Sequence, residues 1–293
     1  AGFIGSHLVD WLVGENDVRV LDNLSSGQRD NVHSKAEFLH GDIRDREVVE
    51  NALDGVDIVF HEAALVSVQG SISDPVTSHA TNATGTLNVL EAARKQNARV
   101  IAASSAAIYG RPDEIPITES DPTTPTSPYG IQKLAVDHYL QRYNELYGLP
   151  TVGLRYFNVY GPRQQGGDYS GVISIFRTQA ESGGPITVDG EGQQTRDFIH
   201  VSDVVQANLL AAQTDSTGEA FNIGTGQSIS IQGLAEMINR ITDGEADIVH
   251  RAPRSGDIQH SESSIEKARA ELGFEPQIEI QEGLERLINE ESD

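Results

Sequence analysis

The first half of the chain alternates short runs of β-forming residues with stretches of helical periodicity. Such alternation is typical of β–α–β units, in which a helix returns the chain so that successive strands lie parallel. The pattern predicts an α/β fold with a doubly wound parallel sheet. The expected strands are Val18–Leu21, Ala36–Leu39, Asp57–Phe60, Arg99–Ala103 and Thr151–Tyr156, and the expected helices are Ile4–Val13, Arg46–Leu53, Ser78–Gln96 and Pro128–Tyr147.

The pattern changes after Gly161, where glycine-rich loops and short strands replace the regular alternation. Helical periodicity returns at Ile231–Ile241 and Ile265–Leu272. A chain of 293 residues is long enough for one or two domains. We therefore expect a doubly wound domain at residues 1–160 and a smaller α/β domain at residues 161–293, with part of residues 195–225 returning to the first.

The charge balance is strongly acidic, with 44 acidic against 21 basic residues and a formal net charge of −23. This balance argues against a nucleic-acid partner, because a phosphate backbone needs a basic surface. Few of the basic residues are lysines; they are Lys35, Lys95, Lys133 and Lys267. Low lysine with abundant carboxylate resembles proteins of salt-loving organisms, in which salt screens the self-repulsion. A merely acidic cytosolic protein would fit the composition as well.

Two absences narrow the chemistry and the location further. The chain has no cysteine, which excludes disulfides, thiolate metal sites and cysteine nucleophiles. No apolar run approaches the ~20 residues that span a bilayer, and no signal-peptide pattern opens the sequence. We therefore expect a cytoplasmic protein without a membrane partner. The histidines show no ligand spacing, so no metal site is expected.

A glycine turn, formed by Gly2, Phe3, Ile4 and Gly5, leads directly into the first helix. Glycines there let a pyrophosphate approach the N–H groups at the positive end of the helix. Seventeen residues beyond Gly5 stands Asp22, at the end of the next strand, where a carboxylate accepts hydrogen bonds from a ribose and disfavours a 2′-phosphate. NAD is therefore predicted over NADP. The sequence begins inside this motif, and a chain without the preceding strand and first glycine is expected to expose apolar surface and to hold the pyrophosphate less firmly.

The candidate catalytic residues are Ser105, Tyr129 and Lys133. Tyr129 and Lys133 share one face of the helix expected over Pro128–Tyr147, because residues four apart are neighbours. A free tyrosine has a pKa of about 10, which a nearby ammonium group and an oxidised nicotinamide would lower. Tyr129 could then remove a hydroxyl proton while a hydride leaves the same carbon. Ser105 ends an apolar strand, and strand C-termini in such sheets line the ligand crevice.

These residues and their surroundings resemble the extended short-chain dehydrogenase/reductase family, in its nucleotide-sugar epimerase and dehydratase branch. The resemblance spans essentially the whole chain and implies a Rossmann-like domain followed by a smaller substrate-binding domain. It also implies NAD as the cofactor, with Lys133 on the nicotinamide ribose. The further positions implied for NAD binding are Asn23, Ser26, Gly27, Asp42, Ile43, Ala63, Ala64, Asn82, Tyr156 and Val159, together with Tyr129.

Ala106 and Ala107 discriminate among the reactions of this family. Related sugar 4,6-dehydratases carry an acid/base pair there, and decarboxylating relatives keep a glutamate at the position of Ala107. Reductive epimerases of the family use a cysteine, which this chain lacks. The resemblance thus implies inversion at C4 of a UDP-hexose through a transient 4-keto sugar. A uronate epimerase, an oxidoreductase and a catalytically silent NAD-binding regulator remain alternatives.

The resemblance also assigns the UDP-sugar site and an assembly. In close relatives a bulky tyrosine at the position of Ser261 excludes N-acetyl groups, so the small serine predicts that N-acetylhexosamine nucleotides are accepted. Arg196 and Arg254 would bind the diphosphate, and Asp257 the nucleoside ribose. A homodimer is expected through the helices of Ser78–Gln96 and Pro128–Tyr147. The implied substrate-binding residues are Ser105, Tyr129, Asn158, Val172, Arg196, Arg254, Asp257 and Ser261.

Overall fold

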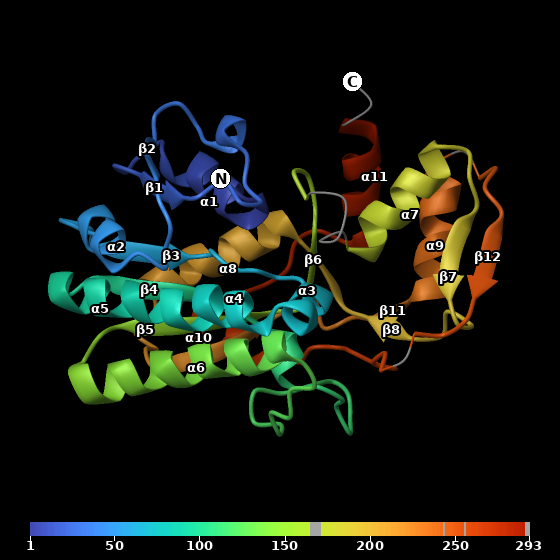
Figure 1. The fold of residues 1–293 in the computed structure, drawn as a ribbon. Coiled ribbons are helices and arrows are strands. Elements are labelled where there is room, and N and C mark those ends of the chain that lie inside the picture. Colours follow the sequence, from blue (N-terminus) through green and yellow to red (C-terminus); the bar gives the residue numbers. More distant parts are fainter. Residues whose placement is uncertain (165–170, 243, 255, 291–293) are drawn as a thin grey trace.

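The computed structural model describes residues 1–164, 171–242, 244–254 and 256–290 (Figure 1). Its largest sheet is parallel, with the strand order β10-β5-β4-β3. A second parallel pair joins β1 to β2. These parallel ladders confirm the predicted α/β class. The strands are β1 (Arg19–Asp22), β2 (Glu37–His40), β3 (Ile58–His61), β4 (Arg99–Ser105), β5 (Thr151–Tyr156) and β10 (Glu219–Ile223).

Strand β4 is buried because helices cover both faces of the sheet (Figure 1). Val100 and Ala102 pack into one apolar cluster with the helices on their side, whereas Ile101 and Ala103 pack into another on the opposite side. This alternation explains why the strand is a continuous apolar run in the sequence. The first cluster involves α2 (Arg46–Ala52), α5 (Thr86–Gln96) and α6 (Pro128–Tyr147), and the second involves α1 (Phe3–Leu12), α8 (Val201–Gln213) and α10 (Glu266–Leu272).

A smaller unit, at the right of Figure 1, has an apolar core of its own. Its elements are α7 (Val172–Glu181), β7 (Ile186–Asp189), α9 (Ile231–Ile241), β12 (Ile248–Arg251) and α11 (Ile280–Glu290). Short ladders join β6 (Asn158–Tyr160) to β9 (Phe198–His200) and β8 (Thr195–Arg196) to β11 (Ile229–Ser230). After β9 the chain returns to the large sheet, where α8 packs on β4 and β10 pairs with β5.

The single helix expected over Ser78–Gln96 is instead three segments, which corrects that prediction. They are α4 (Pro75–His79), a π-helical segment at Ala80–Gly85, and α5. A further short helix, α3 (Val68–Ser73), precedes them. The π-helical segment fits tightly against the structure around it, because a Cβ atom on Gly85 would lie 2.6 Å from the side chain of Ile43. Such π-bulges are frequent at functional sites.

Candidate active site

The first turn of α6 carries Tyr129 in a fixed position. Ser127 caps the helix by accepting a hydrogen bond from the Gly130 amide at 3.1 Å, and Pro128 occupies the first helical position. The Tyr129 amide donates to the Ser71 hydroxyl of α3 at 3.1 Å. Tyr129 and Lys133 are both buried on this helix. The helix start therefore fixes the backbone from which the phenol projects.

Strand β4 delivers Ser105 to the same place. A short 3-10 turn, Ala106–Ile108, follows the strand, and the Ser105 hydroxyl accepts a hydrogen bond from the Ala107 amide at 3.1 Å. The Ser105 side chain also lies close enough to the Tyr129 phenol to favour its ionised form. The contact depends on Gly130, because a Cβ atom there would lie only 2.6 Å from the Ala107 carbonyl oxygen.

Lys133 completes the group. Its ammonium nitrogen lies 5.9 Å from the centre of the Tyr129 ring and donates to the Ala103 carbonyl oxygen at 2.7 Å. The structure thus brings Ser105, Tyr129 and Lys133 together, although 24 residues separate the serine from the tyrosine in the sequence. They lie at the carboxyl end of β4, where ligands bind in sheets of this kind.

Burial controls the proton affinities of these groups. It raises the pKa of Tyr129 to about 12, with Glu62 adding to the rise and the Ser105 side chain opposing it. Burial lowers the pKa of Lys133 to about 8, against the attraction of Glu62 and Asp137. In the protein alone, desolvation of the phenolate therefore dominates the Tyr129 pKa. The lowering expected from Lys133 together with an oxidised nicotinamide stays a prediction.

Glu62 is a site residue that the sequence did not single out. It follows β3 directly, and its carboxylate accepts a hydrogen bond of 2.8 Å from the Tyr156 hydroxyl. Asn208 of α8 donates to that hydroxyl at 2.7 Å. Burial raises the pKa of Glu62 to about 7. A carboxyl group inside the otherwise apolar run at residues 62–66 was the available signal.

The glycine turn at the start of α1 fits a pyrophosphate. Gly2 is the N-cap residue and offers no side chain to the first helical amides, and a Cβ atom on it would meet nothing within 4 Å. The amides of the first turn can therefore receive an anion. Gly27 packs so closely on Ala1 that a Cβ atom would lie 2.8 Å from its carbonyl carbon. The predicted residues Phe3 and Ile4 belong to the helix, where Ile4 packs against the sheet and Phe3 contacts the ring of His7.

The carboxylate of Asp22 lies at the end of β1, as the sequence predicts. One oxygen lies 3.1 Å from the backbone nitrogen of Ala1 and the other accepts from the Leu24 amide at 2.7 Å. Asp22 thus stands beside the glycine turn, which is the arrangement needed to reach the ribose and the pyrophosphate of one dinucleotide. The chain's own residues fit NAD on both counts.

Asp42 and Asn23 lie side by side at this edge. Asn23 donates to Asp42 at 2.9 Å, and the Arg44 guanidinium donates two hydrogen bonds to the same carboxylate, at 2.7 and 3.0 Å, with a third from the Arg44 amide at 2.8 Å. These bonds, those of Arg44 foremost, hold the pKa of Asp42 well below its usual range. Ile43 points instead into the core beside Gly85, and Ser26 lies in the exposed loop before Gly27.

Asn82 holds the loop after β3, which contains Ala63 and Ala64. Its side-chain oxygen accepts from the Leu65 amide at 2.8 Å, and its nitrogen donates to the Leu65 carbonyl at 3.0 Å and to Gln132 at 2.8 Å. The side chain is buried in the π-helical segment. Asn82 therefore ties the predicted cofactor loop to α6, the helix that carries Tyr129.

On the substrate side, the structure joins two predicted residues that are 61 positions apart. Arg196 donates to the Asp257 carboxylate at 2.6 Å. The backbone beside Arg196 is fixed by Asp197, a buried residue that the sequence did not single out. The Asp197 carboxylate accepts hydrogen bonds from the backbone and side chains of Thr225 and Ser263.

The remaining substrate-binding predictions are more dispersed. Asn158 donates to the Asp197 carbonyl at 2.8 Å, and Ser261 is buried with its amide on the Thr195 carbonyl at 3.2 Å. Arg254 is 71% exposed and pairs with Asp189 at 2.5 Å, so it does not join Arg196 in this structure. Val172 begins α7, and the Val159 carbonyl accepts from Gln164 at 3.1 Å.

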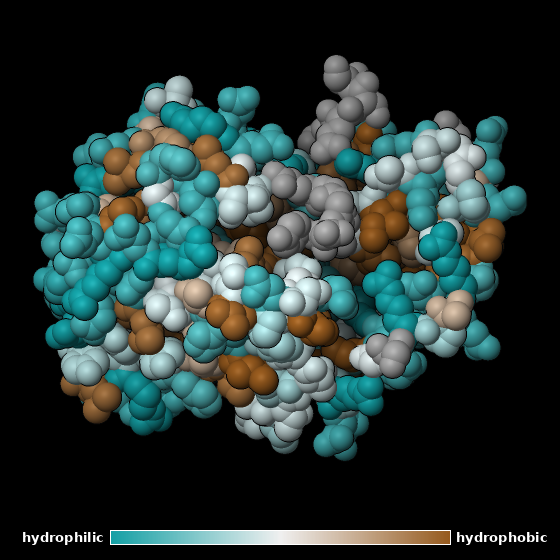
Figure 2. All heavy atoms as spheres, in the orientation of Figure 1, coloured by the Kyte–Doolittle hydropathy of each residue, from teal (hydrophilic) through white to brown (hydrophobic). Residues whose placement is uncertain are grey.

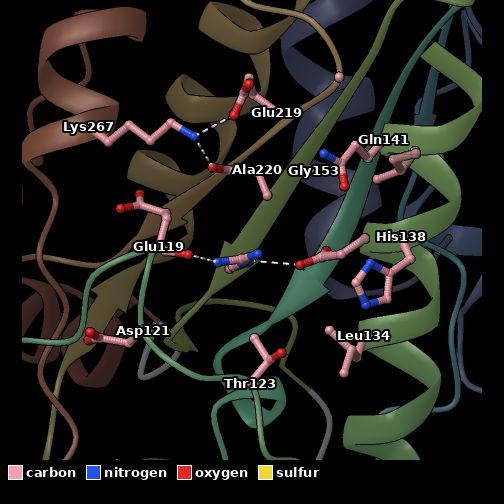
Figure 3. A pocket seen from close by; sticks show the side chains of 14 residues that line it. Glu119, Asp121, Thr123, Leu134, His138, Gln141, Gly153, Glu219, Ala220 and Lys267 are labelled. Atoms are coloured by element: carbon pink, nitrogen blue, oxygen red, sulfur yellow. Dashed lines mark hydrogen bonds and ion pairs between the residues drawn. The ribbon is translucent and has the colours of Figure 1, made fainter. Parts of the chain in front are cut away.

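A separate cavity of about 280 Å³ lies between α6, β5, β10 and the loop that contains Glu119 and Asp121 (Figure 3). Its lining does not include Ser105, Tyr129 or Lys133. Its wall contains the buried ion pair in which Arg155 donates to Asp137 at 2.7 Å. The cavity is therefore distinct from the candidate active site. Its wall supplies Arg155, the partner of Asp137, which lies one turn beyond Lys133 on α6.

Two features are absent from the described ranges. Within them, no group of three or more histidine, aspartate and glutamate side chains is arranged to bind a metal ion. None of their helices combines the length and the apolar character needed to cross a membrane.

The described site is therefore a serine, a tyrosine and a lysine that meet at the carboxyl end of a parallel sheet, in an α/β fold whose glycine turn and Asp22 fit NAD. Residues 1–224 match the model of the NAD dependent epimerase/dehydratase family, and the chain belongs to that family. A UDP-glucose 4-epimerase of Mycolicibacterium smegmatis is 36% identical over 98% of this chain and 95% of its own.

Two solved structures are also similar to the chain. The UDP-glucose 4-epimerase of Thermotoga maritima with UDP-glucose has a TM-score of 0.96 and 39% identity, covering 99% of this chain and 95% of its own. The UDP-N-acetylglucosamine 4-epimerase of Methanobrevibacter ruminantium, in complex with UDP-N-acetylmuramic acid, has a TM-score of 0.94 and 37% identity over 98% and 94%.

Proposed function

We propose that the chain is an NAD-dependent 4-epimerase of UDP-hexoses that works through a transient 4-keto sugar. The observation that carries this proposal is the contact of Ser105 with Tyr129, followed directly by the methyl side chains of Ala106 and Ala107. The hydroxyl groups of Ser105 and Tyr129 would lie beside the reacting carbon and support its oxidation. Alanines cannot move the additional protons that dehydration needs.

Each catalytic residue has one task in this mechanism. Tyr129, in its phenolate form, takes the proton of the C4 hydroxyl and later returns it, while Ser105 hydrogen-bonds the same sugar oxygen. Lys133 places a positive charge beside the Tyr129 oxygen and so favours the phenolate that accepts the proton. NAD held at the glycine turn and Asp22 would supply a reversible hydride acceptor for the sugar C4, with its nicotinamide ribose on Lys133. The sequence of steps is redox-neutral overall.

The cofactor is assigned to the glycine turn and the strand ends next to it. Gly2 and Gly5 would receive the pyrophosphate, Asp22 the adenosine ribose, and Lys133 the nicotinamide ribose. The other residues predicted to bind NAD are proposed to contact it from the positions described above. Arg196, Asn158 and Arg254 would hold the UDP diphosphate. Because Arg196 contacts Asp257 at 2.6 Å, one ligand carrying a diphosphate and a ribose could contact both side chains.

The decisive experiment compares the chain with its Tyr129→Phe variant on UDP-glucose and UDP-galactose. Loss of a general base predicts a decrease in kcat of roughly 10²–10⁴-fold, with NAD still retained. Interconversion of both sugars without net NADH formation supports the proposal. Net NADH would instead identify an oxidoreductase, turnover of UDP-uronates alone a uronate epimerase, and retained NAD without turnover a silent regulator.

We further propose that N-acetylhexosamine nucleotides are accepted, because Ser261 is small and lies beside the strand that carries Arg196. Ser261→Tyr should remove activity on UDP-N-acetylglucosamine and spare activity on UDP-glucose. Ser261→Ala is the matched control and should keep both activities. Since Ser261 is buried, the thermal unfolding midpoint of each variant must be measured first. Equal loss on both substrates in a folded variant would defeat the assignment.

A homodimer and the domain boundary at residues 160 and 161 also belong to the proposal. Apolar side chains are exposed among hydrophilic ones on the face where α3 and α4 lie (Figure 2); they include Val68, Ile72 and Val76, with Ile131 on the adjoining α6. An interface through α4, α5 and α6 would cover such side chains. Light scattering of the purified chain tests the dimer. The cytoplasmic location expected from the sequence stays a prediction.

A further inference from the structure

Glu62 occupies a position between the cofactor turn and the catalytic helix. It follows the last residue of β3, and its Cβ atom lies 4.0 Å from where a Cβ atom would stand on Gly5 of α1. Its side chain is half-buried. The mechanism above assigns it no step, although a carboxylate removed from water there is unfavourable unless it is paired.

Two neighbouring elements hold the Glu62 carboxylate in one orientation. The Asn208 amide nitrogen, which can only donate, gives a hydrogen bond of 2.7 Å to the Tyr156 oxygen. The single hydrogen of Tyr156 is therefore free for Glu62, which accepts it at 2.8 Å. Asn208 is itself anchored by donating to the Val204 carbonyl at 2.9 Å within α8. The hydrogen bonds therefore run from Asn208 to Tyr156 and from Tyr156 to a carboxylate oxygen of Glu62.

The charged and titratable groups that face Glu62 come from two of the elements around it. From α6, Lys133 attracts the carboxylate, and the Tyr129 phenolate would be repelled by it. From β5 comes Tyr156; α8 contributes the uncharged Asn208, and α1 contributes Gly5. The preceding residue, His61, is buried and has its pKa lowered to about 3, so it is neutral.

Lys133 is attracted by two carboxylates, but they are not equivalent. Asp137 lies one turn along α6 and is already paired with the buried Arg155 at 2.7 Å. Glu62 receives instead the neutral hydroxyl of Tyr156. It follows His61, which pairs with Ala102 of β4, and the next residue of β4, Ala103, accepts the Lys133 ammonium at its carbonyl oxygen at 2.7 Å. The Lys133 ammonium is therefore the cation that acts on the Glu62 carboxylate. Removing Glu62 would leave the buried ammonium with a carboxylate that another cation shares.

We propose that Glu62 is a positioning residue whose carboxylate, held by Tyr156 and Asn208, is the counter-charge that keeps Lys133 protonated in the catalytic centre. It acts through Lys133 and does not touch the reacting sugar atoms. The consequence for catalysis rests on the proposed function, whereas the effect on Lys133 does not. Protonated Lys133 is the form that stabilises the Tyr129 phenolate.

The chain offers a direct measurement because it has only four lysines. Lysine labelled with carbon-13 at Cε gives one NMR titration curve for each of them, and Lys133→Arg assigns the curve of Lys133. Glu62→Gln should lower the Lys133 midpoint by about one pH unit, the lower end of the effect of a neighbouring opposite charge. An unchanged midpoint in the folded variant would overturn the proposal.

Glu50→Gln is the matched control, since Glu50 of α2 pairs with Lys95 at 2.7 Å and is not among the groups that act on Lys133. It should leave the Lys133 curve unchanged. If Glu62→Gln does not fold, Tyr156→Phe tests the same point, because losing the hydrogen bond disfavours the Glu62 carboxylate and should move the Lys133 midpoint in the same direction. A Tyr156→Phe variant with an unmoved midpoint would also contradict the proposal.

Activity separates this proposal from the proposed function. If both hold, Glu62→Gln moves the alkaline limb of the kcat/KM profile toward neutrality by the shift seen for Lys133. A Lys133 shift in a chain that epimerises no UDP-hexose would preserve the role of Glu62 and reject the epimerase. Normal epimerisation with an unmoved Lys133 would do the reverse.

Discussion

At the scale of single residues, His61 shows how one hydrogen bond fixes a protonation state. The Thr86 hydroxyl donates its single hydrogen to the Asn82 carbonyl oxygen at 2.7 Å. The His61 Nε2 atom, 2.9 Å from the same hydroxyl, must therefore donate to it. The ring is buried, and burial followed by the charge of Lys133 lowers its pKa to about 3. A neutral imidazole thus lies beside the loop that Asn82 anchors.

This lowered pKa predicts an acid-sensitive fold. The unfolded chain binds a proton on His61 below about pH 6.5, whereas the folded chain does not until about pH 3. The stabilisation is therefore complete above pH 6.5 and decreases as the pH falls, by up to about 1.4 kcal/mol per pH unit. Urea unfolding of the chain and of His61→Gln between pH 7 and pH 4 measures the difference. Parallel curves would contradict the assignment, because all other titrating groups are common to both proteins.

At the scale of elements, the bounds of α6, β5 and α9 agree with those read from the sequence, because each has clear periodicity and a clear start. The spacing that places Tyr129 and Lys133 on one face of α6 was predictable for the same reason. The role of Glu62 was not, since a carboxyl after a strand looks the same whether water or a lysine faces it. Nor could the sequence show that the Tyr129 pKa rises, because that depends on how completely β4 and α6 exclude water.

The junction between α6 and the turn after β4 gives a prediction at this scale. A Cβ atom on Gly130 would lie 2.6 Å from the Ala107 carbonyl oxygen and 2.9 Å from the Cβ atom of Pro125, and neither partner is a flexible side-chain end. Gly130→Ala should therefore displace the helix start, destabilise the fold by about 1–3 kcal/mol, and lower kcat through the adjoining Tyr129.

Gly14→Ala is the matched control for the Gly130 substitution. A Cβ atom on Gly14, in the turn after α1, would meet nothing within 4 Å. Its urea midpoint and its kcat should stay close to those of the unmodified chain. If Gly130→Ala retained full activity and stability, the contact between α6 and the turn would not control the position of Tyr129.

At the scale of the whole molecule, the fold carries a net charge of −23, whereas the proposed substrate is itself an anion. Many cations are already paired with carboxylates at or near the surface, among them Arg19 with Glu37 and Lys267 with Glu219. Exposed pairs of this kind contribute about 0–1 kcal/mol each. The excess of carboxylates leaves a repulsion that acts over the whole surface and weakens as salt is added.

Moderate salt should therefore stabilise this chain, because screening reduces the general repulsion more than it weakens the exposed ion pairs. The Debye length falls from about 10 Å at 0.1 M to about 3 Å at 1 M ionic strength. Thermal unfolding midpoints should rise across this range. The KM for a UDP-sugar should decrease as salt is first added, because the approach of an anion to the acidic surface becomes easier. Sodium chloride and sodium perchlorate at equal low ionic strength should act alike if screening is the cause.

Neutralising exposed carboxylates by Glu15→Gln and Asp17→Asn should reduce the salt response, because fewer charges then remain to be screened. A midpoint that falls steadily with salt would mean that the ion pairs outweigh the net charge, and that the acidic surface does not limit the stability of the fold.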